Sequence, residues 1–92
     1  MRPDLEIVAE MVPPGSRVLD LGCGNGELLA HLRDVRQCSG YGIEIADANV
    51  LACAQRGVNV IQLNLEDGLA LFEDQSFDVV LQIGRASCRE RV

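Results

Sequence analysis

The sequence contains no lysine and no tryptophan, and it has only one tyrosine, two phenylalanines and one histidine. With so few aromatic side chains, the core of a folded domain must be built mainly from aliphatic residues. Eight basic residues, all of them arginine, stand against fourteen acidic ones, which gives a formal net charge of −6. An acidic chain without a basic stripe argues against nucleic acid as the main partner and against an anionic membrane surface.

Long apolar runs and closely spaced cysteines are also missing. No run approaches transmembrane length, and the first residues lack the apolar segment of a signal peptide. The cysteines show no C-x-x-C spacing, and the single His31 has no second set of ligands near it, so we expect neither a zinc site nor a disulfide-rich secreted scaffold. The four cysteines are Cys23, Cys38, Cys53 and Cys88. These absences together predict a reduced, cytoplasmic protein.

Apolar residues make up 48% of the chain, as in ordinary globular domains. Their spacing predicts strands over residues 17–21, 39–45, 58–63 and 76–81, and helices over 4–12, 27–34 and 48–56. Asp47 is expected to cap the third helix and Gly57 to follow its last turn. The stretch 64–75 is rich in turn residues, with at most one helical turn at 69–72. Alternating strands and helices predict an α/β fold: a three-layer parallel sheet in a single domain.

The most informative stretch, VLDLGCGNGELL, lies between the first strand and the following helix. Gly22, Gly24 and Gly26 let the backbone pass close to a ligand, and the helix that they precede aims its N–H groups at a negative group. A dinucleotide fingerprint would place glycine where this chain has Glu27. The carboxylates of Glu27 and Asp20 would repel a pyrophosphate, whereas they favour the ammonium and sulfonium of S-adenosylmethionine.

Two further strand ends carry polar groups suited to a nucleoside. Glu44 lies at the carboxyl end of the second strand, 22 residues after Gly22, where an acid binds ribose hydroxyls in both NAD and S-adenosylmethionine sites. After the third strand, Asn64 can accept a hydrogen bond from an adenine amino group and the Leu65 amide can donate one to the ring. These groups meet at the carboxyl ends of adjacent parallel strands, where open α/β sheets bind ligands. The predicted cofactor site comprises Asp20, Gly22, Cys23, Gly24, Gly26, Glu44, Ile45, Asn64 and Leu65, with Cys23 contributing backbone rather than thiolate chemistry.

At these motifs the sequence resembles the class I S-adenosylmethionine-dependent methyltransferases, and most closely the methionine biosynthesis family MetW. The stretches that carry the likeness are Arg2–Leu5, Ser16–Leu29, Arg56–Gln62 and Ser76–Asp78. The resemblance implies a Rossmann-like fold and S-adenosylmethionine as cofactor, held by the glycine loop and Glu44. It also implies a role in methionine biosynthesis beside homoserine O-acyltransferase. One departure is Asn64, which stands where the superfamily usually has Asp. We expect it to weaken adenine binding by about 1 kcal/mol.

The resemblance also implies a seven-stranded sheet in the order 3-2-1-4-5-7-6, of which four strands are predicted here. Residues 1–82 are therefore expected to form a partial methyltransferase domain without its substrate-binding half, prone to partial folding. Residues 83–92 resemble the in-frame translation of a short-read sequencing adapter, and we expect this tail to be non-native.

Three functions remain open from the sequence. The first is methyl transfer, for which no catalytic residue can be named. The second is a non-catalytic cofactor-binding partner that activates homoserine O-acyltransferase. The third, disfavoured by Asp20 and Glu27, is a fragment of an NAD-binding oxidoreductase.

Overall fold

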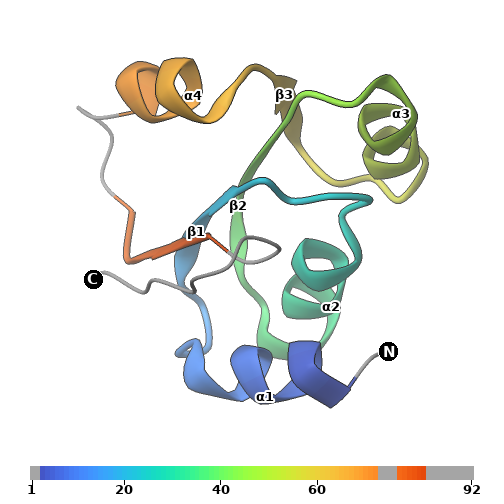
Figure 1. The fold of residues 1–92 in the computed structure, drawn as a ribbon. Coiled ribbons are helices and arrows are strands. Elements are labelled where there is room, and N and C mark those ends of the chain that lie inside the picture. Colours follow the sequence, from blue (N-terminus) through green and yellow to red (C-terminus); the bar gives the residue numbers. More distant parts are fainter. Residues whose placement is uncertain (1–2, 73–76, 83–92) are drawn as a thin grey trace.

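The computed structural model describes residues 3–72 and 77–82, which alternate between helices and strands (Figure 1). The elements in chain order are α1 Pro3–Met11, β1 Arg17–Leu21, α2 Glu27–Arg36, β2 Ser39–Glu44, α3 Asp47–Gln55, β3 Val60–Gln62, α4 Leu65–Phe72 and β4 Val79–Leu81. The predicted strands and the first three helices are confirmed, with most boundaries shifted by one to three residues. The start of the predicted fourth strand, at residue 76, lies outside the described residues.

The four strands form one parallel sheet in the order β3-β2-β1-β4. Leu19 of β1 pairs with Tyr41 of β2 on one side and with Val80 of β4 on the other, so β1 lies inside the sheet. This order matches the first four positions expected from the class I methyltransferase sheet. It also brings the carboxyl ends of β1, β2 and β3 to a single edge, where Figure 1 shows the loops into α2, α3 and α4.

The two faces of the sheet are covered by different helices, because successive strand side chains point to opposite faces. Val18 belongs to an aliphatic cluster with residues of α1, α2 and α3, whereas Leu19 belongs to a second cluster that includes Leu65 of α4. The molecule therefore has the predicted three layers. The alternation also places Asp20 on the Val18 face, under the glycine loop, and this placement matters for the site.

The structure corrects two local predictions. Asp47 is the first residue of α3 rather than its cap; Ala46 occupies the N-cap position and makes no side-chain capping bond. The stretch after Asn64 forms a helix of eight residues rather than one turn. The role of Gly57 is confirmed: its φ is +74°, and the N–H of Gly57 and of Val58 donate to the carbonyls of Ala54 and Cys53, as in a Schellman motif.

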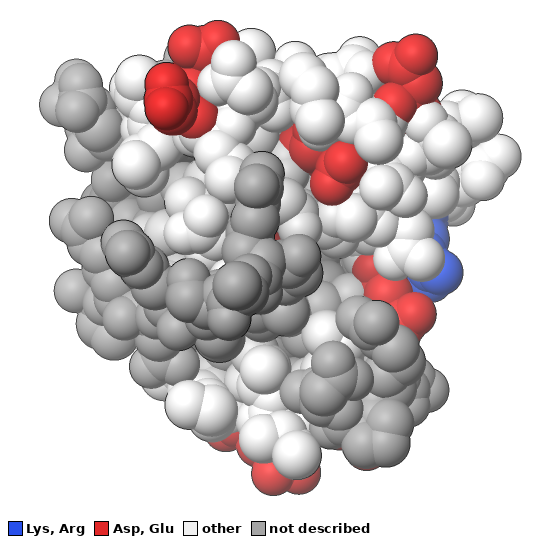
Figure 2. Space-filling model, viewed as in Figure 1, with Lys and Arg blue, Asp and Glu red and all other residues white. Residues whose placement is uncertain are grey.

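The surface reflects the acidic composition. On the face shown in Figure 2, acidic side chains are scattered among uncharged ones, and the basic side chains of the described residues are visible only at its right-hand edge. None of the described helices is long and apolar enough to cross a membrane. Within residues 3–72 and 77–82, no group of three or more His, Cys, Asp or Glu side chains is arranged to hold a metal ion.

Candidate functional site

The glycine loop between β1 and α2 depends on a left-handed backbone at all three of its glycines. The φ angles of Gly22, Gly24 and Gly26 are +80°, +60° and +82°, values that side chains with a Cβ adopt at a cost. The N–H groups of Gly22 and Cys23 donate to the carbonyl of Ile43 at 2.8 and 3.0 Å, which fastens the loop to β2.

The three glycines differ in what surrounds them. A Cβ added at Gly22 or Gly24 would meet nothing within 4 Å, so these two positions leave bare backbone next to open space. A Cβ at Gly26 would instead lie 2.9 Å from the Cys53 sulfur. Gly22 and Gly24 thus suit a closely approaching ligand, whereas Gly26 is required by packing between the loop and α3.

Glu44, at the end of β2, connects the loop to the start of α3. Its Oε1 accepts the Gly24 N–H at 2.9 Å, and its Oε2 accepts the Ala46 N–H at 3.0 Å and the Asn49 carboxamide at 3.4 Å. Partial burial of this carboxylate would raise its pKa, but these donors outweigh the burial and hold the pKa of Glu44 below its ordinary value. Glu44 is therefore a fixed anion beside the bare glycine backbone.

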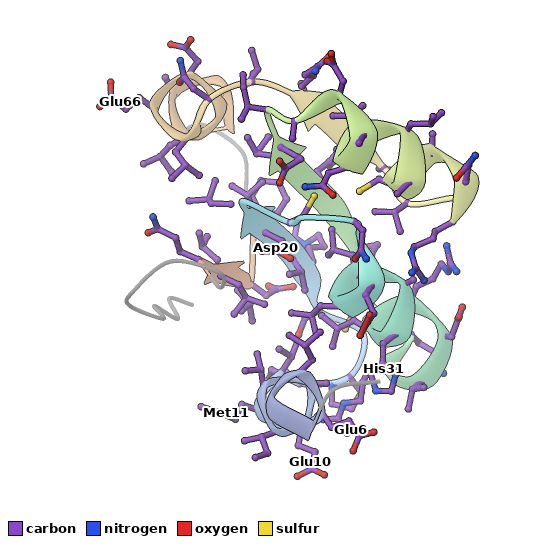
Figure 3. All side chains as sticks on the ribbon, turned by 45° about the vertical axis from the view of Figure 1, so that its right-hand side comes forward. Glu6, Glu10, Met11, Asp20, His31 and Glu66 are labelled. Atoms are coloured by element: carbon purple, nitrogen blue, oxygen red, sulfur yellow. The ribbon has the colours of Figure 1, made fainter. Side chains whose placement is uncertain are left out.

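Asp20 is a second carboxyl group, buried beneath the loop with only 2% of its surface exposed (Figure 3). Within the described part of the chain, its Oδ1 has no hydrogen-bond partner. Burial, together with the negative charge of Glu44, raises the pKa of Asp20 to about 7. An unpartnered, buried carboxylate oxygen is costly unless a donor or a cation arrives to satisfy it.

A pocket opens at the carboxyl ends of β1, β2 and β3. It is lined by Gly22, Ile43, Glu44, Ile45, Leu63, Asn64 and Leu65. Five of the nine predicted cofactor residues line this pocket, and the other four belong to β1 and the adjoining loop. Leu65 is the first residue of α4, so its N–H has no acceptor within the helix and is available to a ligand.

Asn64 has a structural task that the sequence analysis did not foresee. Its Oδ1 accepts the Asp67 N–H at 2.7 Å, and its Nδ2 donates to Asp67 Oδ2 at 3.0 Å. The backbone carbonyl of Asn64 accepts the Gly68 N–H, the first bond of α4. Asn64 is thus the N-cap of α4, and an adenine amino group would have to share its Oδ1.

Two buried thiols lie under the loop. The sulfurs of Cys23 and Cys53 are 3.7 Å apart, and that of Cys53 lies 3.3 Å from the Gly24 carbonyl oxygen. Burial, with Cys53 close by, raises the pKa of Cys23 above its ordinary value, so its thiol stays protonated and packs as a small apolar group. Figure 3 shows His31, the only histidine, near α1 rather than beside the loop.

Asn49 and Cys53 were not predicted from the sequence. Both lie on α3, from which Asn49 contacts Glu44 and Cys53 contacts the glycine loop. Their places in the sequence offered one signal: Asn49 falls in the first turn of the helix that follows Glu44, and Cys53 follows one turn later.

The family model of methionine biosynthesis protein MetW matches residues 2–87. The bifunctional methionine biosynthesis protein MetXA/MetW of Rhodopirellula baltica is 46% identical over 86 residues, covering 85% of this chain and 14% of that protein. A probable phthiotriol/phenolphthiotriol dimycocerosates methyltransferase 2 of Mycobacterium ulcerans is 35% identical over 82 residues, covering 84% of this chain and 31% of that protein. The chain therefore spans less than a third of the length of these two relatives.

Solved structures agree with these relatives. A methyltransferase of Thiobacillus denitrificans, in complex with S-adenosylhomocysteine, superposes with a TM-score of 0.76 at 25% identity, over 94% of this chain and 38% of that one. A second methyltransferase with this ligand, from Geobacter sulfurreducens, gives a TM-score of 0.65 at 28% identity, over 91% of this chain and 37% of that one. The chain is a class I methyltransferase-like domain, and it belongs to the MetW family of methionine biosynthesis proteins.

Proposed function

We propose that the pocket and the glycine loop bind S-adenosylmethionine. The observation that carries the proposal is the position of Glu44, whose carboxylate lines the pocket and is held beside the bare backbone of Gly24. A carboxylate there can accept the two hydroxyls of a ribose. The solved methyltransferases with S-adenosylhomocysteine support this proposal by their similarity to the chain.

The remaining predicted residues suit the other parts of the same molecule. Ile45 and Leu63 give the pocket apolar walls for an adenine ring, and the Leu65 N–H is available to a ring nitrogen. The ammonium of the cofactor would satisfy the unpartnered oxygen of Asp20. When bound, the cofactor supplies an electrophilic methyl group on its sulfonium.

A dinucleotide fits these charges less well. Its pyrophosphate would meet two acidic side chains at the loop, Asp20 beneath it and Glu27 in the first turn of α2. In the described structure Glu27 has one buried oxygen without a hydrogen-bond partner. These acidic side chains would therefore repel the negative charges of a pyrophosphate, whereas they would attract a positively charged sulfonium or ammonium.

Calorimetric titration of the chain with S-adenosylhomocysteine tests the cofactor proposal. We expect binding that NAD does not compete with, and a loss of roughly 10- to 100-fold in Glu44→Gln, because charge-assisted bonds to ribose are removed. Asp47→Asn is the matched control: it removes an exposed acid three residues away, and we expect it to bind as the unchanged chain does. Competition by NAD, or equal affinities of the two variants, would overturn the proposal.

We further propose that the complete protein acts with homoserine O-acyltransferase in the cytoplasm. The fused MetXA/MetW relative supports a physical association of the two activities, and three buried free thiols suit a reducing compartment. The test is affinity purification of the full-length protein expressed together with the acyltransferase. Co-elution, with an acyltransferase rate that responds to S-adenosylhomocysteine, is expected; separate elution at low salt would refute the association.

Methyl transfer is the second candidate activity, and it is favoured by the methyltransferases among the relatives. Transfer depends mostly on alignment of an acceptor with the methyl group. The chain covers a minor part of those proteins, so we assign no catalytic residue. Release of S-adenosylhomocysteine by the full-length protein, in a metabolite extract and without added acyltransferase, would favour this candidate over an activator.

A further inference from the structure

We propose that Asn49 is a second ribose-recognising side chain, which gives up its contact with Glu44 when the cofactor binds and then contacts the ribose diol. The inference rests on the cofactor site proposed above. Asn49 lies half-buried in the first turn of α3, and its Nδ2 donates to Glu44 Oε2 at 3.4 Å. It is outside the nine residues predicted from the sequence.

The carboxylate of Glu44 has a limited capacity to accept hydrogen bonds, with about four lone-pair positions, two on each oxygen. In this structure Oε2 accepts the Ala46 N–H and the Asn49 carboxamide, and Oε1 accepts the Gly24 N–H. The backbone N–H of Ile45 is a further donor to the same carboxylate. The vicinal diol of a ribose brings two more donors, so its full recognition displaces at least one of the donors already in place.

The donor that leaves at least cost is Asn49. The Gly24 N–H is fixed within a loop that is fastened to β2, and the Ala46 N–H is fixed at the start of α3. Their bonds of 2.9 and 3.0 Å are shorter than the 3.4 Å of the Asn49 bond. The Asn49 carboxamide also sits on a side chain that can rotate, so its release strains no backbone.

The released carboxamide remains beside the diol, because Glu44 itself marks where the hydroxyls bind. It carries both donors and an acceptor, so it can donate to the oxygen of a hydroxyl whose hydrogen Glu44 accepts. Glu44 and Asn49 together then satisfy both the donors and an acceptor of the diol. A purely structural Asn49 would support α3 or the Glu44 rotamer and would be indifferent to the sugar hydroxyls.

Deoxy ligands separate these two roles. We would measure dissociation constants of S-adenosylhomocysteine and its 2′-deoxy and 3′-deoxy analogues for the unchanged chain, Asn49→Ala and Gln62→Ala. Gln62 is the matched control: its carboxamide holds the same β2–α3 turn, through the Ile45 carbonyl at 3.0 Å and the Asp47 carboxylate. Among the described residues, these are its side-chain partners, and Glu44 is not one of them.

We expect Asn49→Ala to weaken S-adenosylhomocysteine about 3- to 10-fold, and to leave unchanged the affinity for the deoxy analogue that lacks the contacted hydroxyl. Gln62→Ala should affect all three ligands alike. Equal losses with all three ligands in Asn49→Ala, or no loss, would overturn the inference while leaving the cofactor site standing. Absence of binding by the unchanged chain would overturn both. Asn49→Leu keeps nearly the same shape without a donor or a charge, and it gives the same comparison if the alanine variant does not fold.

Discussion

Burial beneath the glycine loop disfavours the ionised form of the Asp20 carboxyl group. Its pKa in the folded chain is about 7, against 3.8 without these surroundings. Because the pKa of Asp20 is raised in the folded chain, its contribution to the free energy of unfolding is fully present below about pH 4. That contribution is lost as the pH rises through 7. The same group provides the anion that we propose for the cofactor ammonium. A neutral side chain at this position therefore favours the stability of the fold, whereas a carboxylate favours binding of the cofactor.

We expect Asp20→Asn to be more stable than the unchanged chain at pH 8, by a few kcal/mol at about 1.4 kcal/mol for each unit of pKa shift. The advantage should shrink as the pH falls towards 4, because Asp20 is then neutral in the folded chain and begins to be protonated in the unfolded chain as well. Urea denaturation from pH 4 to 8 measures the difference, and calorimetry should show weaker S-adenosylhomocysteine binding by the variant. Parallel stability profiles of the two chains would show that Asp20 does not titrate as described.

Gly26 and Gly15 form a matched pair for the effect of packing under the loop. Both have positive φ, +82° and +75°, so alanine costs about 1–2 kcal/mol of backbone strain at either position. Only at Gly26 would the new Cβ press on the buried Cys53 sulfur, at 2.9 Å. We expect Gly26→Ala to lose about 1–3 kcal/mol more than Gly15→Ala in urea denaturation, and equal losses would contradict the packing argument.

Sequence reasoning predicted the site residues that belong to the glycine motif, and it missed those whose contacts depend on how the neighbouring helices begin. Gly22 and Gly24 follow from their place between a strand and a helix, and Glu44 follows from its distance to them. The capping role of Asn64 was missed because the helix that it begins was not recognised. Asn49 was missed because its contact with Glu44 depends on how the turn after β2 orients the first turn of α3.

At the scale of elements, α4 shows why a turn-rich segment can form a helix. Gly68 weakens helix propensity, which favoured an irregular segment in the sequence analysis. In the structure a Cβ at Gly68 would lie 2.7 Å from the Ile43 side chain, so glycine lets α4 pack closely on β2. Tertiary contact and the Asn64 cap together outweigh the propensity cost.

The cap predicts a specific weakness of α4. We expect Asn64→Ala to lose about 1 kcal/mol because the Asp67 N–H loses its acceptor, and Asn64→Asp to retain most of the stability. Hydrogen exchange should show faster exchange at Asp67 and Gly68 in the alanine variant, with β1 unchanged. Uniformly faster exchange over the whole sheet would mean that Asn64 supports the global fold rather than this helix end.

At the scale of the whole molecule, the strand order and the layers were predictable because parallel sheets with right-handed crossovers allow few arrangements. The same rules say little about which of the last residues belong to the native protein. The MetW match runs to residue 87, beyond Gln82, while the expectation of a foreign tail concerns residues 83–92. We propose that this tail is non-native, and sequencing of the genomic locus across its codons tests it. A frame that continues into different codons after Gln82 is expected; the same ten codons in the genome would refute it.

Strand β4 forms an outer edge of the four-stranded sheet. Among the described residues, β4 pairs with β1 alone, and it is anchored there by the Arg17 N–H on Asp78 Oδ2 at 2.8 Å and by the Asp78 N–H on the Arg17 carbonyl at 2.9 Å. A strand edge without a partner recruits other chains. We expect the 92-residue chain to self-associate as its concentration rises, and a version extended to the length of its MetW relatives to stay monomeric at the same concentrations. Light scattering after size-exclusion chromatography measures both. A monodisperse monomer of the 92-residue chain with a sharp, cooperative melt would show instead that this edge is protected and that the four-stranded unit is stable by itself.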